Sequence, residues 1–119
     1  MILVDTSVWI DHLRTSDQRL VALLHDVQVQ AHPWVIGELA LGRLAQREEF
    51  LHLLSELPQA TVVSSAEIML FLSDRRLHGL GIGYVDLQLL GATVVAPGTR
   101  LWTRDKRLAA VARRLGVAA

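Results

Sequence analysis

The chain has 119 residues, of which 51% are hydrophobic, so it can bury one core and we expect a single domain over residues 1–119. Twelve basic and twelve acidic residues give zero net charge, so the charge of the whole chain does not indicate a nucleic-acid-binding protein. The absence of cysteine excludes disulfides, zinc–thiolate sites and thiol catalysis.

The first half of the chain predicts strands that alternate with helices. Residues 2–5 are apolar without alternation, as in a buried strand, and Thr6 or Ser7 can cap the helix that follows. Pro33 suits the first turn of a later helix, and Pro58 stops another. We expect strands at residues 2–5 and 27–30, and helices at about 6–12, 17–24, 33–44 and 48–57.

The second half continues the alternation. Ser64-Ser65-Ala66-Glu67 is typical of a capping box that opens a helix. The segment Gly79-Leu80-Gly81-Ile82-Gly83 lacks the spacing of a phosphate-binding loop and predicts a flexible turn. Residues 92–95 alone would pass for a strand, but the spacing from Asp86 onward favours a helix. We expect strands at 60–63 and 100–103, and helices at 64–79, 84–95 and 106–115.

Strands that alternate with helices predict an α/β fold with a central parallel sheet. The longest uncharged run, residues 87–99, is too short to cross a bilayer and contains glycine and proline. No signal-like segment is present at the N-terminus, because Asp5 and Asp11 interrupt it. We therefore expect a cytoplasmic protein that does not associate with membranes.

Four carboxylates stand where an ordinary core would not place one. Asp5 and Asp105 each follow a predicted strand, Asp86 lies in the first turn of a helix, and Glu38 interrupts an apolar helix. Each has a simpler explanation taken singly: helix capping for Asp5 and Asp105, the helix dipole for Asp86, and a solvated face for Glu38. One shared cation explains all of them together, because ligands collect at the carboxyl ends of strands in such sheets.

Carboxylate oxygens favour Mg²⁺ or Mn²⁺ over zinc. The five histidines form no pair with metal-ligand spacing, which argues against a histidine-bound metal. Clustered acids repel one another in the absence of metal, so some of their pKa values should be raised. The sequence therefore predicts a divalent-metal site built from Asp5, Glu38, Asp86 and Asp105, and a metal-dependent hydrolase.

The acids lie within sequence segments that extend, in order, over nearly the whole chain: Val4-Asp5-Thr6-Ser7-Val8-Trp9-Ile10, the helix of Glu38, Gly83-Tyr84-Val85-Asp86-Leu87-Gln88-Leu89-Leu90 and Leu101-Trp102-Thr103-Arg104-Asp105-Lys106-Arg107-Leu108. Together these segments resemble a PIN-domain ribonuclease, and most closely the VapC toxins of VapBC toxin–antitoxin pairs. The opening V-D-T-S and the T-x-D near the end are each weakly specific alone, but their ordered combination with the two intervening acids is strong.

The resemblance implies a three-layer α/β/α sandwich, with Asp5, Glu38, Asp86 and Asp105 as the metal-binding and catalytic acids. It further implies cleavage of structured RNA (tRNA or rRNA), a cognate VapB-type antitoxin as partner, and homodimerisation. Thr6 and Thr103 match hydroxyl positions beside the site, where they would contact an acid or a phosphate. The chain ends soon after its last predicted helix, so the final strand of many relatives should be short or absent.

The basic residues nearest the acids are the first choices for binding the RNA backbone: Arg104, Lys106 and Arg107. Two other functions stay open from the sequence. One is a PIN nuclease that processes RNA outside a toxin–antitoxin pair. The other is an inactive PIN module that only binds, although such a module should have lost one or more of the acids, and this chain keeps all of them.

Overall fold

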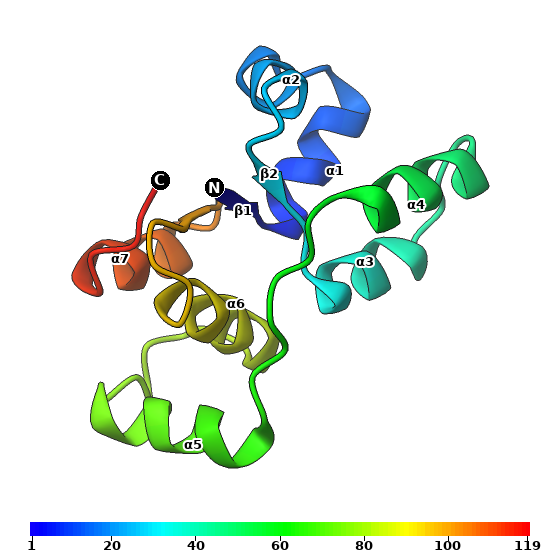
Figure 1. Ribbon diagram of the computed structural model, residues 1–119. Helices are drawn as coiled ribbons and strands as arrows, with labels where there is room; N and C mark the ends of the chain where they lie inside the picture. The colour runs from blue at the N-terminus through cyan, green and yellow to red at the C-terminus, as the bar shows by residue number, and fades with distance from the viewer.

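The structure is a computed structural model that describes residues 1–119 and has a three-stranded parallel sheet surrounded by helices (Figure 1). The strands are β1 (Ile2–Val4), β2 (Val29–Gln30) and β3 (Arg100–Trp102). The helices are α1 (Thr6–Arg14), α2 (Gln18–His25), α3 (Pro33–Ala40), α4 (Arg47–Glu56), α5 (Ser65–Asp74), α6 (Tyr84–Val94) and α7 (Lys106–Arg114). None of these helices has both the length and the apolar character needed to span a membrane.

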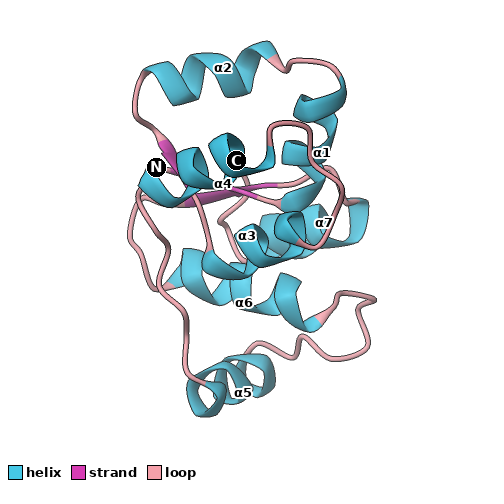
Figure 2. Cartoon of the chain, turned by 90° about the vertical axis from the view of Figure 1, so that its right-hand side faces the viewer, coloured by secondary structure: helices cyan, strands magenta, loops and turns pink.

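The strand order is β2-β1-β3, so β1 lies in the middle and its residues pair on both sides. Ile2 lies opposite Val29 and Arg100, and Val4 lies opposite Trp102. Figure 2 shows the sheet between α2 on one side and α3 and α6 on the other, with α5 outermost. The predicted α/β sandwich with a parallel sheet is therefore confirmed.

Burial follows this order of layers. Leu3 and Val4 of β1 have no exposed surface, because helices cover both faces of the central strand. Helix α6 is buried along seven consecutive residues, from Leu87 to Thr93, since it lies between the sheet and α5. The buried run ends at Thr93 and Val95 is exposed, so only the first half of residues 92–95 shares the continuous burial that makes an apolar helix resemble a strand by sequence alone.

The strand expected at residues 60–63 is wrong. Pairing there is limited to one bridge between Ala31 and Gln59, with hydrogen bonds from Ala31 N to the Pro58 carbonyl (2.9 Å) and from Ala60 N to the Ala31 carbonyl (2.7 Å). Residues 61–64 then run away from the sheet to the start of α5. A β-branched run favours an extended backbone, but a strand also needs a partner along its length.

Two helices end earlier than expected. Helix α3 stops at Ala40 instead of about residue 44, and α5 stops at Asp74 instead of Gly79. Arg76 has a left-handed backbone (φ 53°), which a continuing helix cannot accommodate. The final strand, expected to be short or absent, is reduced to one parallel bridge between Leu101 and Ala118.

Histidine 32 connects the sheet to the helix that carries Glu38. Its side chain is fully buried, and its Nδ1 accepts the backbone N–H of Trp34 at 3.0 Å, which caps α3. An imidazole that accepts at Nδ1 is neutral, and burial lowers the pKa of His32, while the Thr61 backbone opposes this shift. Helix α3 is therefore capped by a histidine that must stay uncharged.

This cap should make the protein sensitive to acid. The folded-state pKa of His32 lies below that of the unfolded chain, so the contribution to stability is complete above about pH 6.5 and is lost as the pH falls below it. His32→Asn keeps an acceptor for Trp34 N–H and cannot titrate, so urea unfolding between pH 7.5 and pH 5 should depend less on pH. His32→Ala also removes the cap and should lose about 0.5–2 kcal/mol at pH 7.5. An unchanged pH dependence in His32→Asn would contradict this role.

Candidate active site

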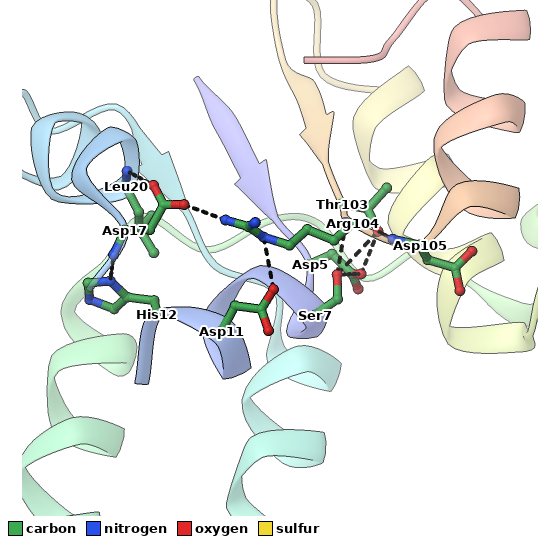
Figure 3. A network of polar contacts seen from close by, with 9 residues as sticks. All are labelled: Asp5, Ser7, Asp11, His12, Asp17, Leu20, Thr103, Arg104 and Asp105. Carbon is green, nitrogen blue, oxygen red and sulfur yellow. Dashed lines mark hydrogen bonds and ion pairs between the residues drawn. The ribbon is translucent and has the colours of Figure 1, made fainter. Parts of the chain in front are cut away.

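Asp5 lies directly after β1 and is 6% exposed. Its backbone begins α1, but its side chain makes no capping hydrogen bond. Instead, Oδ2 accepts from the hydroxyls of Ser7 and Thr103, each at 2.7 Å (Figure 3). Helix capping, the simpler explanation of Asp5, is therefore wrong, because its carboxylate is held by hydroxyls from both ends of the chain.

Asp105 has the same sequence context but a different local role. It begins α7, and its Oδ1 accepts the backbone N–H of Leu108 at 2.9 Å, so the capping explanation is confirmed for this oxygen. The second oxygen makes no hydrogen bond within the chain, and the carboxyl group projects away from the Asp5 network (Figure 3). Capping therefore leaves one oxygen of Asp105 available to a ligand.

Asp86 lies in the first turn of α6, where its Oδ2 accepts the backbone N–H of Gly83 at 3.0 Å. Burial raises the pKa of Asp86, and the Gly83 hydrogen bond opposes this shift. The negative charges of Asp5, Asp105 and Glu38 raise the pKa further. Asp86 is thus close enough to each of the other three acids to be repelled by it, and its raised pKa has the direction expected for a member of a clustered set.

Glu38 lies on the exposed side of α3, and its Oε1 accepts from the Thr6 hydroxyl at 2.7 Å. Thr6 begins α1 directly after Asp5, so this bond connects the helix of Glu38 to the end of β1. The two threonines beside the predicted site each donate to one of its acids, Thr6 to Glu38 and Thr103 to Asp5.

None of the four acids forms an ion pair with a basic side chain. The ion pairs of the chain are formed by four other acids, Asp11, Asp17, Asp26 and Glu56. Clustered carboxylates without a counter-charge are costly, and all their donor atoms are hard oxygens, so this donor set fits a divalent cation such as Mg²⁺ or Mn²⁺. No three Asp, Glu or His side chains are arranged to hold one ion together. Mg²⁺ commonly keeps several waters and binds only one or two carboxylates, so it does not need such an enclosure.

Comparison with known proteins identifies the family of the chain. No family model matches the chain. Two curated relatives, both named Ribonuclease VapC32, come from Mycobacterium tuberculosis strains CDC 1551 / Oshkosh and ATCC 25618 / H37Rv. Each is 54% identical to this chain over 118 residues, which is 99% of this chain and 95% of the relative. The chain belongs to the VapC family.

The basic residues predicted to bind RNA have different surroundings in this VapC protein. Lys106 is exposed at the start of α7. The Arg107 side chain lies against Gly81, where an added Cβ would come within 2.8 Å of it, so a larger residue at position 81 would displace the Arg107 side chain. Arg104 forms ion pairs with Asp11 and Asp17, so its charge is already balanced. Of these three residues, Lys106 and Arg107 therefore form no ion pair with an acid of the chain.

Ser7 is the contact that sequence reasoning missed. Its hydroxyl donates to Asp5 and accepts the backbone N–H of Arg104 at 3.0 Å. The Thr103 hydroxyl has the same arrangement, because it donates to Asp5 and accepts the backbone N–H of Asp105 at 3.0 Å. The only local signal was a second hydroxyl in the segment Val4-Asp5-Thr6-Ser7, where the sequence suggested Ser7 only as a possible cap of the helix that follows.

Removing the Thr103 hydroxyl should weaken metal binding in this VapC protein. Thr103→Val keeps the side-chain shape but loses both hydrogen bonds, so Asp5 loses one of the two groups that orient it. We expect Mn²⁺ affinity to fall roughly 10- to 100-fold, as for other groups that orient metal ligands. Calorimetric titration of metal-free protein measures this, with Thr103→Ser as the control that keeps the hydroxyl. Equal Mn²⁺ affinity of the valine variant and the wild type would contradict the role.

Proposed function

We propose that the chain is a Mg²⁺- or Mn²⁺-dependent endoribonuclease that acts as the toxin of a type II toxin–antitoxin pair and hydrolyses structured RNA, tRNA or rRNA. The carrying observation is the set of four neighbouring acids without a basic partner, at the edge of the sheet where β1 and β3 end. The name of the curated relatives, Ribonuclease VapC32, supports RNA as the substrate.

The resemblance to PIN-domain ribonucleases supplies the finer parts of the proposal. These are a PIN architecture, a cognate VapB-type antitoxin that inhibits the enzyme, a homodimer, and action in the cytoplasm. Co-expression with the neighbouring gene tests the antitoxin: growth arrest on induction of this chain alone, relieved by a small co-expressed DNA-binding partner, supports a toxin. A chain that processes RNA without arresting growth is instead a housekeeping nuclease.

In the proposed reaction, Asp5, Glu38, Asp86 and Asp105 would hold the cation, one or two of them directly and the others through its waters. When bound, the cation supplies a Lewis acid at the scissile phosphate and makes water a stronger nucleophile at neutral pH. Ser7 and Thr103 orient the Asp5 carboxylate, and Gly83 N–H orients that of Asp86. Lys106 and Arg107 bind backbone phosphates, which places the RNA without reading its sequence.

Hydrolysis by water leaves a 5′-phosphate and a 3′-hydroxyl and does not use the RNA 2′-hydroxyl as nucleophile. The purified protein should therefore cut tRNA or rRNA in Mn²⁺, stop in EDTA, and still cut a substrate with a 2′-deoxynucleotide at the cleaved position. Mapping of RNA 5′ ends identifies that position. Full cleavage in EDTA, or products that end in a cyclic phosphate, would overturn the mechanism.

A further inference from the structure

Arg104 connects the loop between β3 and α7 to the first two helices. Its Nε lies 3.2 Å from Asp11 Oδ2 on α1, and its Nη2 contacts Asp17 Oδ2 just before α2 (Figure 3). We call these two ion pairs the Arg104 bridge. Asp17 also accepts the backbone N–H of Leu20 at 3.0 Å, and its own N–H donates to His12 Nδ1 at 3.0 Å. The acidic end of the bridge is therefore fixed to the start of α2.

Asp17 stays charged in this arrangement. The hydrogen bond from Leu20 N–H lowers the pKa of Asp17 most, and the Arg104 charge lowers it further, while partial desolvation opposes both. The guanidinium of Arg104 also lies 5.9 Å from the centre of the Trp102 ring, on the strand that precedes the loop. A cation held by two carboxylates and an aromatic face has little positive charge left for an RNA phosphate.

The backbone of Arg104 is part of the Asp5 network. Its N–H donates to Ser7 Oγ, and the residues on either side are Thr103, which donates to Asp5, and Asp105. Through its two ion pairs, the Arg104 side chain thus anchors the segment Thr103–Asp105 (Figure 3). This segment contains Asp105 itself and the Thr103 hydroxyl that orients Asp5.

We propose that Arg104 is a positioning residue for the metal-binding acids: through its bridge to Asp11 and Asp17 it holds the segment Thr103–Asp105 against α1. This inference rests on the proposed function, since the acids it positions are those assigned to the cation. Single exposed ion pairs contribute little to stability, but this bridge joins three charges from three parts of the chain. Its effect should therefore be on the geometry of the site more than on the stability of the fold.

The test breaks the bridge from either end. Arg104→Gln removes the cation, and the double variant Asp11→Asn, Asp17→Asn removes both anions while asparagine still caps α2. Arg19→Gln is the matched control, because the Arg19 guanidinium lies 4.4 Å from the same Trp102 ring without an ion pair to an acid. Arg104→Lys, which has no planar fork to reach both acids, should fall between Arg104→Gln and the wild type.

Four measurements follow: exchange rates of the backbone amides of residues 104 and 105, Mn²⁺ affinity of the metal-free protein, kcat and KM for RNA cleavage, and the salt dependence of RNA binding. We expect faster amide exchange and about tenfold weaker Mn²⁺ binding in both bridge variants, with neither change in Arg19→Gln. kcat should fall with KM for RNA unchanged, and the slope of log affinity against log salt should stay that of the wild type.

A phosphate contact predicts a different pattern. Arg104→Gln alone would then raise KM and lower the salt slope by about 0.7, with amide exchange and Mn²⁺ affinity unchanged. That outcome would overturn the positioning role and support direct RNA contact. If the wild type neither binds Mn²⁺ nor cuts RNA, the proposed function fails. Amide exchange then decides the bridge by itself: faster exchange in both variants supports it, and unchanged exchange overturns it.

Discussion

Replacing Asp86 by Asn should reduce metal-dependent RNA cleavage by at least about 100-fold without unfolding the protein. Asparagine keeps an oxygen that accepts Gly83 N–H, so the first turn of α6 is retained, but it removes a charge assigned to the cation. Single-turnover cleavage of RNA at saturating Mn²⁺ measures the loss. Asp26→Asn, at an exposed acid distant in sequence from the site, is the control and should cut like the wild type.

The same substitution should not destabilise the metal-free protein. The folded-state pKa of Asp86 is raised above that of the unfolded chain, so its ionised form opposes folding at pH 7, and this penalty disappears as the pH falls through the folded-state pKa. Loss of the favourable helix-dipole interaction partly offsets the gain. The variant should therefore melt at or above the wild-type temperature in EDTA. A clearly lower melting temperature, or cleavage within twofold of the wild type, would contradict the role of Asp86.

Mn²⁺ should stabilise the wild-type protein strongly. At 100 times its Kd, a ligand that binds only the folded state adds about 2.7 kcal/mol, which for a domain of this size raises Tm by about 10 °C. The physical reason is relief of the repulsion that Asp86 experiences from Asp5, Glu38 and Asp105, since none of the four acids has a basic partner in the chain. Differential scanning calorimetry with and without Mn²⁺ measures the shift, independently of RNA cleavage.

Screening by salt must be separated from binding. KCl at the same ionic strength weakens repulsion between the carboxylates without occupying a site, so it should raise Tm much less than Mn²⁺. The double variant Asp5→Asn, Asp86→Asn should lose the specific part of the Mn²⁺ effect. An equal rise in KCl, or an undiminished rise in the double variant, would show that Mn²⁺ acts by screening alone.

Much of the fold follows from local sequence. The apolar run before Asp5, the N-cap Ser64 and the spacing of α6 predict their elements because the signals lie within a few neighbouring residues, although only the Ser64 half of the expected capping box forms. The strand expected at 60–63 failed because a strand depends on a partner that its own residues do not specify, and only one bridge forms there.

The four acids show what the sequence determined by itself and what the tertiary structure decided. The identity of the four acids, their order and their positions after strands or in helices could all be read from the sequence. Together these properties predicted a shared cation. Asp5 and Asp105 nevertheless have the same local pattern, an acid between an apolar run and a helix, and only Asp105 caps its helix. The difference comes from Thr103, whose hydroxyl reaches Asp5 across 98 positions of sequence because β1 and β3 pair in parallel and end side by side. Sequence fixes which groups are present, whereas parallel pairing of distant strands decides which of them meet.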